Sequence, residues 1–367
     1  MKRSLQFLVA ATVAFSAPLF AQSVPEITFD SNIDFLTLPA YGEVAGVATN
    51  SRGQIYVLAR TGQPYATLAG ERTFYHGGSR LFQFDQTGKF IKEVGQDTYG
   101  MTFASQVRVD PQDNVWVVDA GSNILTKFDA SGTFLMVLGR KPETISVRTG
   151  PGVVARDLDL TQPPAPPAPP GGGEGGGGGA SAPGAGTKSE IFSRPADVAF
   201  DRLGNTYVAD GFGTNNRIAV FNREGNWVTG WGQTGSGPGQ FNAIRGIASD
   251  AAGNIYVADA GNKRIQVFDS KGTFKSQITG IGAPQALCIT SGPTQVLFSS
   301  NSNDAESMDN GEVYKISLTG QVLGKFGRAG KLVKEFGMTN ALDCRTDTDV
   351  LVGEVWNWRV QKVTLKR

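Results

Sequence analysis

The chain has few of the residues from which metal sites and nucleic-acid surfaces are usually built. Its 367 residues include one histidine and two cysteines. One histidine excludes a site made of two or three imidazoles, and two cysteines exclude zinc fingers, zinc ribbons and a disulfide scaffold. The 34 basic residues are balanced by 33 acidic ones, so no surplus of positive charge exists to neutralise phosphates. We therefore expect no nucleic-acid partner.

A long apolar run occurs once, at the start of the chain. Residues 1–3 carry two positive charges, residues 5–20 are almost uninterrupted apolar sequence, and Ala21 is a small residue at the expected cleavage point. This pattern is typical of a secretory signal peptide, because the run is too short and wrongly flanked for a stable membrane span. An uncleaved anchor is the alternative. We predict a signal peptide at 1–21, export to the periplasm or the cell exterior, and no membrane span after cleavage.

The rest of the chain repeats one phrase. Each copy is a short apolar strand, a turn with Asp or Asn and Gly, and a second strand rich in valine and aromatics. A third strand, a second Asp/Asn-to-Gly turn and a fourth strand follow. The clear copies begin at Gly46, Gln106, Asp197 and Gly246, and weaker ones begin at Ala286 and Ala341. Six units of four antiparallel strands, without helical periodicity, predict an all-β, six-bladed β-propeller spanning 22–367.

The two ends of the repeat array predict how the ring closes. The sixth unit stops after its third strand, at Lys366 and Arg367, whereas residues 26–39 form a strand-like segment without a unit of its own. We expect this N-terminal strand to complete the last blade, so that neither end leaves an open edge. An open β-solenoid is the alternative, and it would need capping units that the sequence does not contain.

One interval between repeats is too long by roughly one repeat. The excess is the segment 141–190, which contains a proline-rich run at 163–170 and a glycine-rich run at 171–179. Such a sequence has little to bury and cannot offset the entropy of ordering it. We predict a disordered Pro/Gly-rich insertion between blades two and three. A proline-rich ligand for a partner domain is the alternative.

The third-strand phrases resemble NHL repeats, most clearly Asn215-Asn-Arg-Ile-Ala-Val-Phe221 and Asn262-Lys-Arg-Ile-Gln-Val-Phe268. Three further stretches resemble peptidylamidoglycolate lyase, the lyase domain of peptidylglycine α-amidating enzymes. They are Tyr75-His-Gly-Gly-Ser-Arg80, Asp210-Gly-Phe-Gly-Thr-Asn-Asn-Arg217 and Trp231-Gly-Gln-Thr-Gly-Ser-Gly-Pro-Gly-Gln-Phe241. The likeness covers nearly all of residues 40–367 and implies the propeller fold; function must be argued from the site.

The resemblance also implies a zinc ion held by three histidines, with tyrosine and arginine doing the chemistry. The implied histidine positions are occupied by Ser105, Arg245 and Asn340, and the tyrosine position by Phe212. The two arginine positions fall on Gly77 and Ala260, and an acidic calcium ligand on Ala341. A hydroxyl, a guanidinium and an amide do not replace three neutral imidazoles. The chain therefore resembles the lyase fold without its zinc and catalytic residues.

Aligning the six first strands places one residue of each blade at the same height in the channel. These residues, which we call the channel ring, are Ala45, Ser105, Ala196, Arg245, Gln285 and Asn340. One arginine among hydroxyl and amide groups suits a carboxylate or another small oxyanion. We expect the ligand site at Ser105, Arg245, Gln285 and Asn340, with Arg108, Asp197 and Asp343 further along the strands and able to pair with Arg245. A polar plug without a ligand is the alternative.

Other residues are weaker candidates. Tyr75, His76 and Phe212 are secondary candidates, His76 because an imidazole is a possible general base. Asp119, Asp210 and Asp259 recur with Arg217 and Arg264 and indicate structural pairs. A polar loop at 301–309 leaves calcium open as a cofactor, although it lacks EF-hand spacing. Cys288 and Cys344 lie one register apart on neighbouring strands, so we expect them to point to opposite faces and to remain free, buried thiols.

Together these features favour an exported, monomeric binding module for a peptide, a protein or a small anionic ligand at the channel mouth. We expect no zinc. The alternative is a metal-dependent lyase or hydrolase, of the peptidyl-α-hydroxyglycine type, that uses a different set of residues.

Overall fold

The computed structural model describes residues 24–37, 42–61, 66–68, 72–74, 78–96, 98, 101–139, 191–212, 215–301 and 311–366. The predicted signal peptide, the predicted insertion at 141–190, and Tyr75, His76 and Gly77 lie outside these residues, as does most of the polar loop at 301–309.

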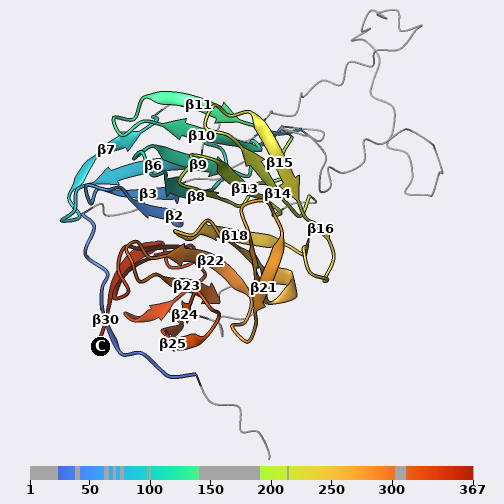
Figure 1. Ribbon diagram of the computed structural model, residues 1–367. Coiled ribbons are helices and arrows are strands. Elements are labelled where there is room, and N and C mark those ends of the chain that lie inside the picture. The colour runs from blue at the N-terminus through green and yellow to red at the C-terminus, as the bar shows by residue number, and fades with distance from the viewer. Residues whose placement is uncertain are drawn as a thin grey trace, which may run out of the picture.

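The structure confirms an all-β propeller of six four-stranded antiparallel blades, which follow one another in chain order from blue to red in Figure 1. Blade 1 contains β2 (Glu43–Thr49), β3 (Ile55–Arg60), β6 (Ser79–Phe84) and β7 (Phe90–Val94); blade 2 contains β8 (Ala104–Val109), β9 (Val115–Asp119), β10 (Ile124–Phe128) and β11 (Phe134–Leu138); blade 3 contains β12 (Asp197–Phe200), β13 (Thr206–Asp210), β14 (Arg217–Phe221) and β15 (Trp227–Trp231). Blade 4 contains β18 (Ile244–Ser249), β19 (Ile255–Asp259), β20 (Arg264–Phe268) and β21 (Phe274–Ile278); blade 5 contains β22 (Pro284–Ile289), β23 (Val296–Asn301), β24 (Glu312–Ser317) and β25 (Val322–Phe326); blade 6 contains β28 (Thr339–Cys344), β29 (Asp349–Glu354), β30 (Arg359–Leu365) and β1 (Phe29–Asn32).

Short elements connect the blades. The strands β4 (Ala66–Leu68) and β5 (Arg72–Phe74) form an antiparallel pair. Two parallel pairs, β16 (Gln233–Thr234) with β17 (Gln240–Phe241) and β26 (Arg328–Ala329) with β27 (Glu335–Phe336), lie in the loops that lead into blades 4 and 6. The 3₁₀-helix η1 (Ala260–Asn262) joins β19 to β20. Across the described ranges, no helix has the length and apolar character needed to cross a bilayer.

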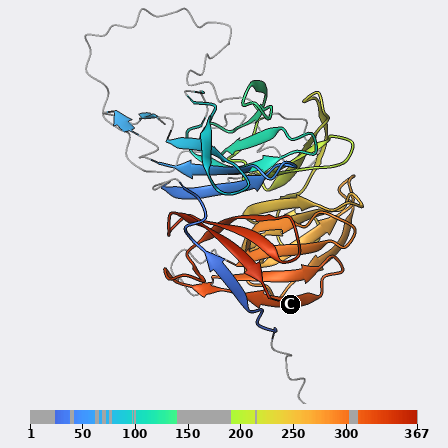
Figure 2. The ribbon, with the colours of Figure 1, turned by 90° about the vertical axis from the view of Figure 1, so that its left-hand side faces the viewer.

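The N-terminal segment closes the ring as the sequence predicts. Strand β1 pairs antiparallel with the C-terminal strand β30, with Phe29 opposite Leu365, and Figure 2 shows this blue strand among the red strands of blade 6. Just before β1, the Ile27 amide donates to the Lys325 carbonyl of β25 at 2.7 Å; after it, the Thr37 amide donates to the Gly88 carbonyl of blade 1 at 3.0 Å. One segment thus joins the outer strands of blades 5, 6 and 1.

The repeated turns form because an acidic or amide side chain satisfies the backbone of its own turn. The Asp110 carboxylate accepts the amides of Gln112 at 3.0 Å and Asn114 at 2.9 Å. Asp201 and Asp250 do the same one and two blades later. Such Asx-type turns explain why Asp or Asn opens the turn in each clear repeat.

The apolar core is divided among the boundaries between blades. One cluster combines Val47 and Val57 of blade 1 with Ala341 and Val360 of blade 6. Because successive blades stack face to back around the axis, each sheet buries both faces, which is why the inner strands are almost continuously buried. The outer strands β7, β11, β15 and β21 are exposed or half-buried along most of their length and end on a buried residue.

The acid–arginine pairs are structural, as expected. The Arg217 Nε lies 3.0 Å from the Asp210 carboxylate and the Arg264 Nε lies 2.8 Å from Asp259, and Arg217 and the two carboxylates are fully buried. Blade 6 carries the same pair as Glu354 and Arg359, at 2.8 Å, with glutamate in place of aspartate. Burial without such a partner would be costly for either charge, so these pairs fix the loops after each second strand.

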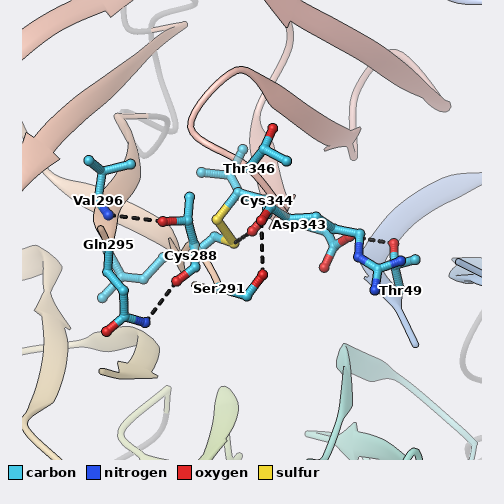
Figure 3. Close-up of a disulfide and its surroundings, with 12 residues drawn as sticks. Thr49, Cys288, Ser291, Gln295, Val296, Asp343, Cys344 and Thr346 are labelled. Carbon is cyan, nitrogen blue, oxygen red and sulfur yellow. Dashed lines mark hydrogen bonds between the residues drawn. A yellow bond between two sulfur atoms is a disulfide. The ribbon is translucent and has the colours of Figure 1, made fainter. Parts of the chain in front are cut away.

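The expectation of two free thiols is wrong, because Cys288 and Cys344 form a disulfide with a Cα–Cα distance of 5.9 Å (Figure 3). The two residues do lie one register apart. Cys288 pairs with the third residue of β23, and the residue of blade 6 that pairs with the third residue of β29 is Asp343, not Cys344. However, adjacent blades stack face to back, so opposite faces of equivalent strands look toward each other. The offset that seemed to separate the sulfurs brings them together, and the bond joins blades 5 and 6.

Candidate functional site

The channel ring lies where each first strand bulges. In blades 1, 2, 4 and 6 the pairing with the second strand shifts across the ring residue, for example between Ala104 and Gln106 around Ser105. In blade 5 the shift spans Gln285 and Ala286. A bulge leaves one residue without a ladder partner and turns its side chain away from the regular face. The ring residues that the sequence places at one height therefore share a structural feature, a β-bulge at the start of the first strand.

Most of the ring is occupied by hydrogen bonds between blades. The Asn340 side-chain amide donates to the carbonyls of Ala45 at 2.6 Å and Ser105 at 3.1 Å, and its oxygen accepts from Gln285 at 2.8 Å. The Ser105 hydroxyl donates to the Pro195 carbonyl at 3.0 Å. These bonds tie blades 1, 2, 3, 5 and 6 across the channel. Three of the four predicted ligand groups therefore act first as a polar closure of the channel.

Gln285 retains one unused acceptor. Its side chain is 3% exposed, and its Oε1 has no hydrogen-bond partner in the described structure. A buried amide oxygen without a donor carries a free-energy cost of about 1–3 kcal/mol.

Arg108 lies deeper in the channel and joins four blades. Its guanidinium donates to both Asp197 carboxylate oxygens, at 2.9 and 2.7 Å, and to the carbonyls of Leu287 at 3.1 Å and Leu342 at 3.2 Å. Burial alone would lower the pKa of Arg108, but the carboxylate of Asp197, with a smaller effect from Asp343, raises it above the ordinary value. Arg108 is therefore a structural cation at the axis rather than an open ligand site.

The expected pairing of Arg245 with these acids is not formed. Arg108 and Asp343 lie three residues beyond the ring on their strands, which is about 10 Å deeper at roughly 3.3 Å per residue. Asp197 is taken by Arg108, and Asp343 accepts the Thr49 hydroxyl. Burial raises the pKa of Asp343. The hydrogen bond from the Thr49 hydroxyl and the charge of Arg108 lower this pKa, but by less than burial raises it.

Arg245 instead stacks on an aromatic ring at the mouth of the channel. Its guanidinium carbon lies 4.0 Å from the centroid of Phe212, and Arg194 lies 4.6 Å from the same centroid. Among the described residues, neither arginine has a carboxylate within ion-pair distance. Burial lowers the pKa of Arg245 and the positive charge of Arg194 lowers it further. An exposed arginine and a half-buried one on the same ring, without an acid, form a site with excess positive charge.

Phe212, a secondary candidate from the sequence, lies against Arg245 of the channel ring, whereas the sequence analysis did not single out Arg194. Arg194 stands where Ala243 and Met338 precede the first strands of blades 4 and 6, with φ values of 57°, 53° and 51°. The repeat has no arginine at this position, so the sequence carried no periodic signal for it. The other secondary candidates, Tyr75 and His76, lie outside the described residues.

The opposite end of the channel opens into a cavity of about 790 Å³. The turns between first and second strands surround it, Arg108 and Asp343 line its inner part, and the Cys288–Cys344 disulfide lies in its wall. Figure 3 shows Asp343 and Thr49 beside this bond. The cavity mixes both signs of charge, and most of its acids are already bound within turns.

The donor set at the ring does not fit zinc. Arg245 places a cation at one of the implied ligand positions, the Asn340 amide is engaged with two carbonyls, and the Ser105 hydroxyl is engaged with a third. Within the described ranges, no cluster of three His, Cys, Asp or Glu side chains has the geometry to hold a metal ion. No chemical step through zinc is therefore derived for these residues.

The profile of the NHL repeat matches residues 241–268, the start of blade 4 and its first three strands. Human NHL repeat-containing protein 3 is 26% identical over 226 residues, covering 60% of this chain and 52% of that protein. Xenopus laevis peptidyl-glycine alpha-amidating monooxygenase B is 26% identical over 348 residues, covering 88% of this chain and 34% of that protein. The chain thus matches between a third and about half of the length of these relatives.

Solved structures agree on the architecture. A streptogramin B lyase superposes with a TM-score of 0.53 at 12% identity, covering 92% of this chain and 98% of that structure. A gluconolactonase from Xanthomonas campestris superposes with a TM-score of 0.55 at 14% identity, covering 94% and 96%. At these identities the likeness concerns the fold alone.

Sequence, fold and comparisons agree on one description. The chain is a six-bladed β-propeller that carries an NHL repeat, and it resembles the lyase portion of amidating enzymes without the residues which that resemblance implies for zinc.

Proposed function

We propose that this propeller is a binding module that recognises a carboxylate, either of a small anion or of a peptide, at the channel mouth formed by Arg245, Phe212 and Arg194. NHL propellers are typically interaction modules, and a rigid ring with variable loops suits that role. The proposal includes export to the periplasm or cell exterior, as the predicted signal peptide implies.

The unpaired stacking of two arginines on Phe212 carries the proposal. Elsewhere in the described structure, arginines that stack on phenylalanine also have an acid: Arg60 pairs with Glu43 and Arg80 pairs with Glu93. Arg245 has the ring but no acid. A guanidinium held flat by an aromatic face keeps its N–H edge free for a bidentate oxyanion.

The unused acceptor of Gln285 narrows the ligand class. Gln285 lies in β22, beside the β18 strand of Arg245, and its buried Oε1 can accept one N–H. A ligand with a carboxylate and an amide N–H close together would satisfy both residues. The end of a peptide, or an N-acylated amino acid, has that combination.

Calorimetric titration of the full chain with N-acetylglycine and its neutral amide tests this proposal. We expect binding of N-acetylglycine but not of the amide, and Arg245→Gln to weaken binding at least tenfold, or about 1.4 kcal/mol. The matched control is Arg80→Gln, which removes an arginine that also stacks on a phenylalanine but has its own acid. Equal binding by the Arg245 variant, or equal binding of acid and amide, would overturn the site.

A lyase of the peptidyl-α-hydroxyglycine type is the second candidate, favoured by the 88% coverage of this chain by an amidating enzyme. It would need a residue set other than Ser105, Arg245 and Asn340. Metal analysis of the purified chain, followed by turnover of a peptidyl-α-hydroxyglycine, separates the candidates. We expect no stoichiometric zinc, leave calcium open, and expect no turnover; one zinc per chain with turnover would favour the enzyme.

A further inference from the structure

Blades 4 and 6 present the same pair of loops on the face that carries Arg245. In each, a short parallel strand pair lies in the loop before the blade, and an asparagine from the loop after the second strand binds it. Asn262 donates to the Gly235 carbonyl and Asn357 to the Gly330 carbonyl, both at 2.8 Å. The arginines of the third strands also match, because Arg264 donates to the Gln240 carbonyl at 3.0 Å and Arg359 donates to the Glu335 carbonyl at 2.9 Å.

The backbone angles of the two blades agree closely. The φ values are 153° and 155° at Gly235 and Gly330, and 73° and 70° at Gly239 and Lys334. Lys263 and Trp358 both have a φ of 53°. The fold therefore uses one loop scaffold twice and does not require a particular side chain at its exposed positions.

Blade 6 differs from blade 4 in what it displays on this scaffold. Where blade 4 has Gly237, Pro238, Gly261 and Lys263, blade 6 has four apolar side chains, which we call the blade 6 patch. They are Leu332, 68% exposed, Val333, 47%, Trp356, 40%, and Trp358, 63%. These side chains contribute little to the core, and they expose apolar surface to water that blade 4 does not expose. Exposed apolar patches of this kind mark interaction sites.

Basic residues surround the patch. Arg328 is 77% exposed, Lys331 is exposed and has no acidic partner in the described structure, and Lys334 meets Asp30 only at 3.5 Å. Glu335 is bound by Arg328 and by the amides of Lys331 and Leu332. Two further acids near Val333, Glu26 and Glu312, pair with Lys325. Since Arg328 and Lys334 each face one acid, the surplus positive charge of the rim comes from Lys331.

We propose that the blade 6 patch docks the propeller on an anionic lipid surface. Tryptophan side chains favour the headgroup layer, exposed aliphatic side chains beside them can enter the acyl boundary, and flanking lysines and arginines are attracted to anionic lipid. A second copy fits less well, since two such patches would bring their positive rims together. Docking by this face would also turn the Arg245 site toward the membrane surface.

Flotation of the full chain with vesicles tests the proposal. We expect it to float with vesicles of equal phosphatidylglycerol and phosphatidylcholine, and less at high salt. The test variant carries the blade 4 residues, Leu332→Gly, Val333→Pro, Trp356→Gly and Trp358→Lys, and should partition at least tenfold more weakly. If the variant with four substitutions fails to fold, Trp358→Lys alone is the second variant. Lysine already adopts this backbone angle at Lys263 in blade 4. The matched control is Phe134→Thr with Leu135→Thr, two side chains 53% and 49% exposed on β11.

Quenching of tryptophan fluorescence by brominated lipids distinguishes membrane binding through the patch from membrane binding through the predicted signal peptide, because residues 1–21 contain no tryptophan. Quenching in the parent and in the control, together with flotation that the test variant loses, supports docking by the patch. Flotation and quenching equal in parent and test variant would overturn it, as would the absence of binding. A concentration-dependent dimer that the test variant abolishes, without vesicle binding, would also overturn it and assign the patch to a second copy.

Discussion

Substitution of Arg108 should destabilise the propeller strongly, because this residue joins blades across the axis. Arg108→Met removes two bonds to Asp197 and two to the carbonyls of Leu287 and Leu342. It leaves the Asp197 carboxylate, which is 0% exposed, with the amides of Val198 and Ile247 as its remaining partners. Breaking a buried ion pair from one side costs about 3–5 kcal/mol. We expect that loss in the free energy of unfolding, measured by urea titration.

A double-mutant cycle shows whether the pair itself is responsible. Arg108→Met with Asp197→Asn leaves no unpaired charge, so it should recover at least about 2 kcal/mol of the loss. The comparison is Arg80→Met, which breaks an exposed pair with Glu93 and should cost at most about 1 kcal/mol. If Arg108→Met costs no more than Arg80→Met, or if the cycle shows no coupling, the structural role of Arg108 is refuted.

Three further predictions concern stability. Replacing Cys288 and Cys344 by alanine opens a loop of 56 residues and should lower the unfolding free energy by about 4 kcal/mol, or roughly 8 °C at about 2 °C per kcal/mol; an unchanged melting temperature would contradict this. Since burial raises the pKa of Asp343, its native state holds the proton more tightly, and stability falls as pH rises from about 4 through that pKa; Asp343→Asn should make the fall less steep in urea titrations across that range. Deleting residues 24–37 removes β1 and the buried Phe29, which should cost more than about 3 kcal/mol and expose an aggregating strand edge, visible by light scattering.

The fold was predictable because each repeat carries its own turn chemistry. Asp110, Asp201 and Asp250 open their turns in the sequence and bind their own turn amides in the structure. The strand that closes the ring was predictable from the number of strands in each repeat, because the last repeat has three strands and the N-terminal segment has one that belongs to no repeat. Neither inference needed any knowledge of how the blades stack.

The site was predictable only in part, because its geometry depends on how neighbouring blades face each other. Aligning the first strands placed Arg245 and Asn340 at one height in the channel. It could not show that the Asn340 side-chain amide donates to two backbone carbonyls. The disulfide was mispredicted for the same reason: alternation within one strand says nothing about which face meets the next blade. Arg194 stands where blades 4 and 6 have Ala243 and Met338, so no repeated arginine pointed to it.

The most direct test of the central claim is an NMR spectrum of the arginine side-chain Nε–Hε groups during titration with N-acetylglycine. The Arg245 signal is assigned by its loss in Arg245→Gln. We predict that this signal shifts in a saturable way, that Arg194 shifts with it, and that the neutral amide leaves both unchanged. A shift confined to other arginines, or no saturable shift at all, would contradict carboxylate binding at the channel mouth.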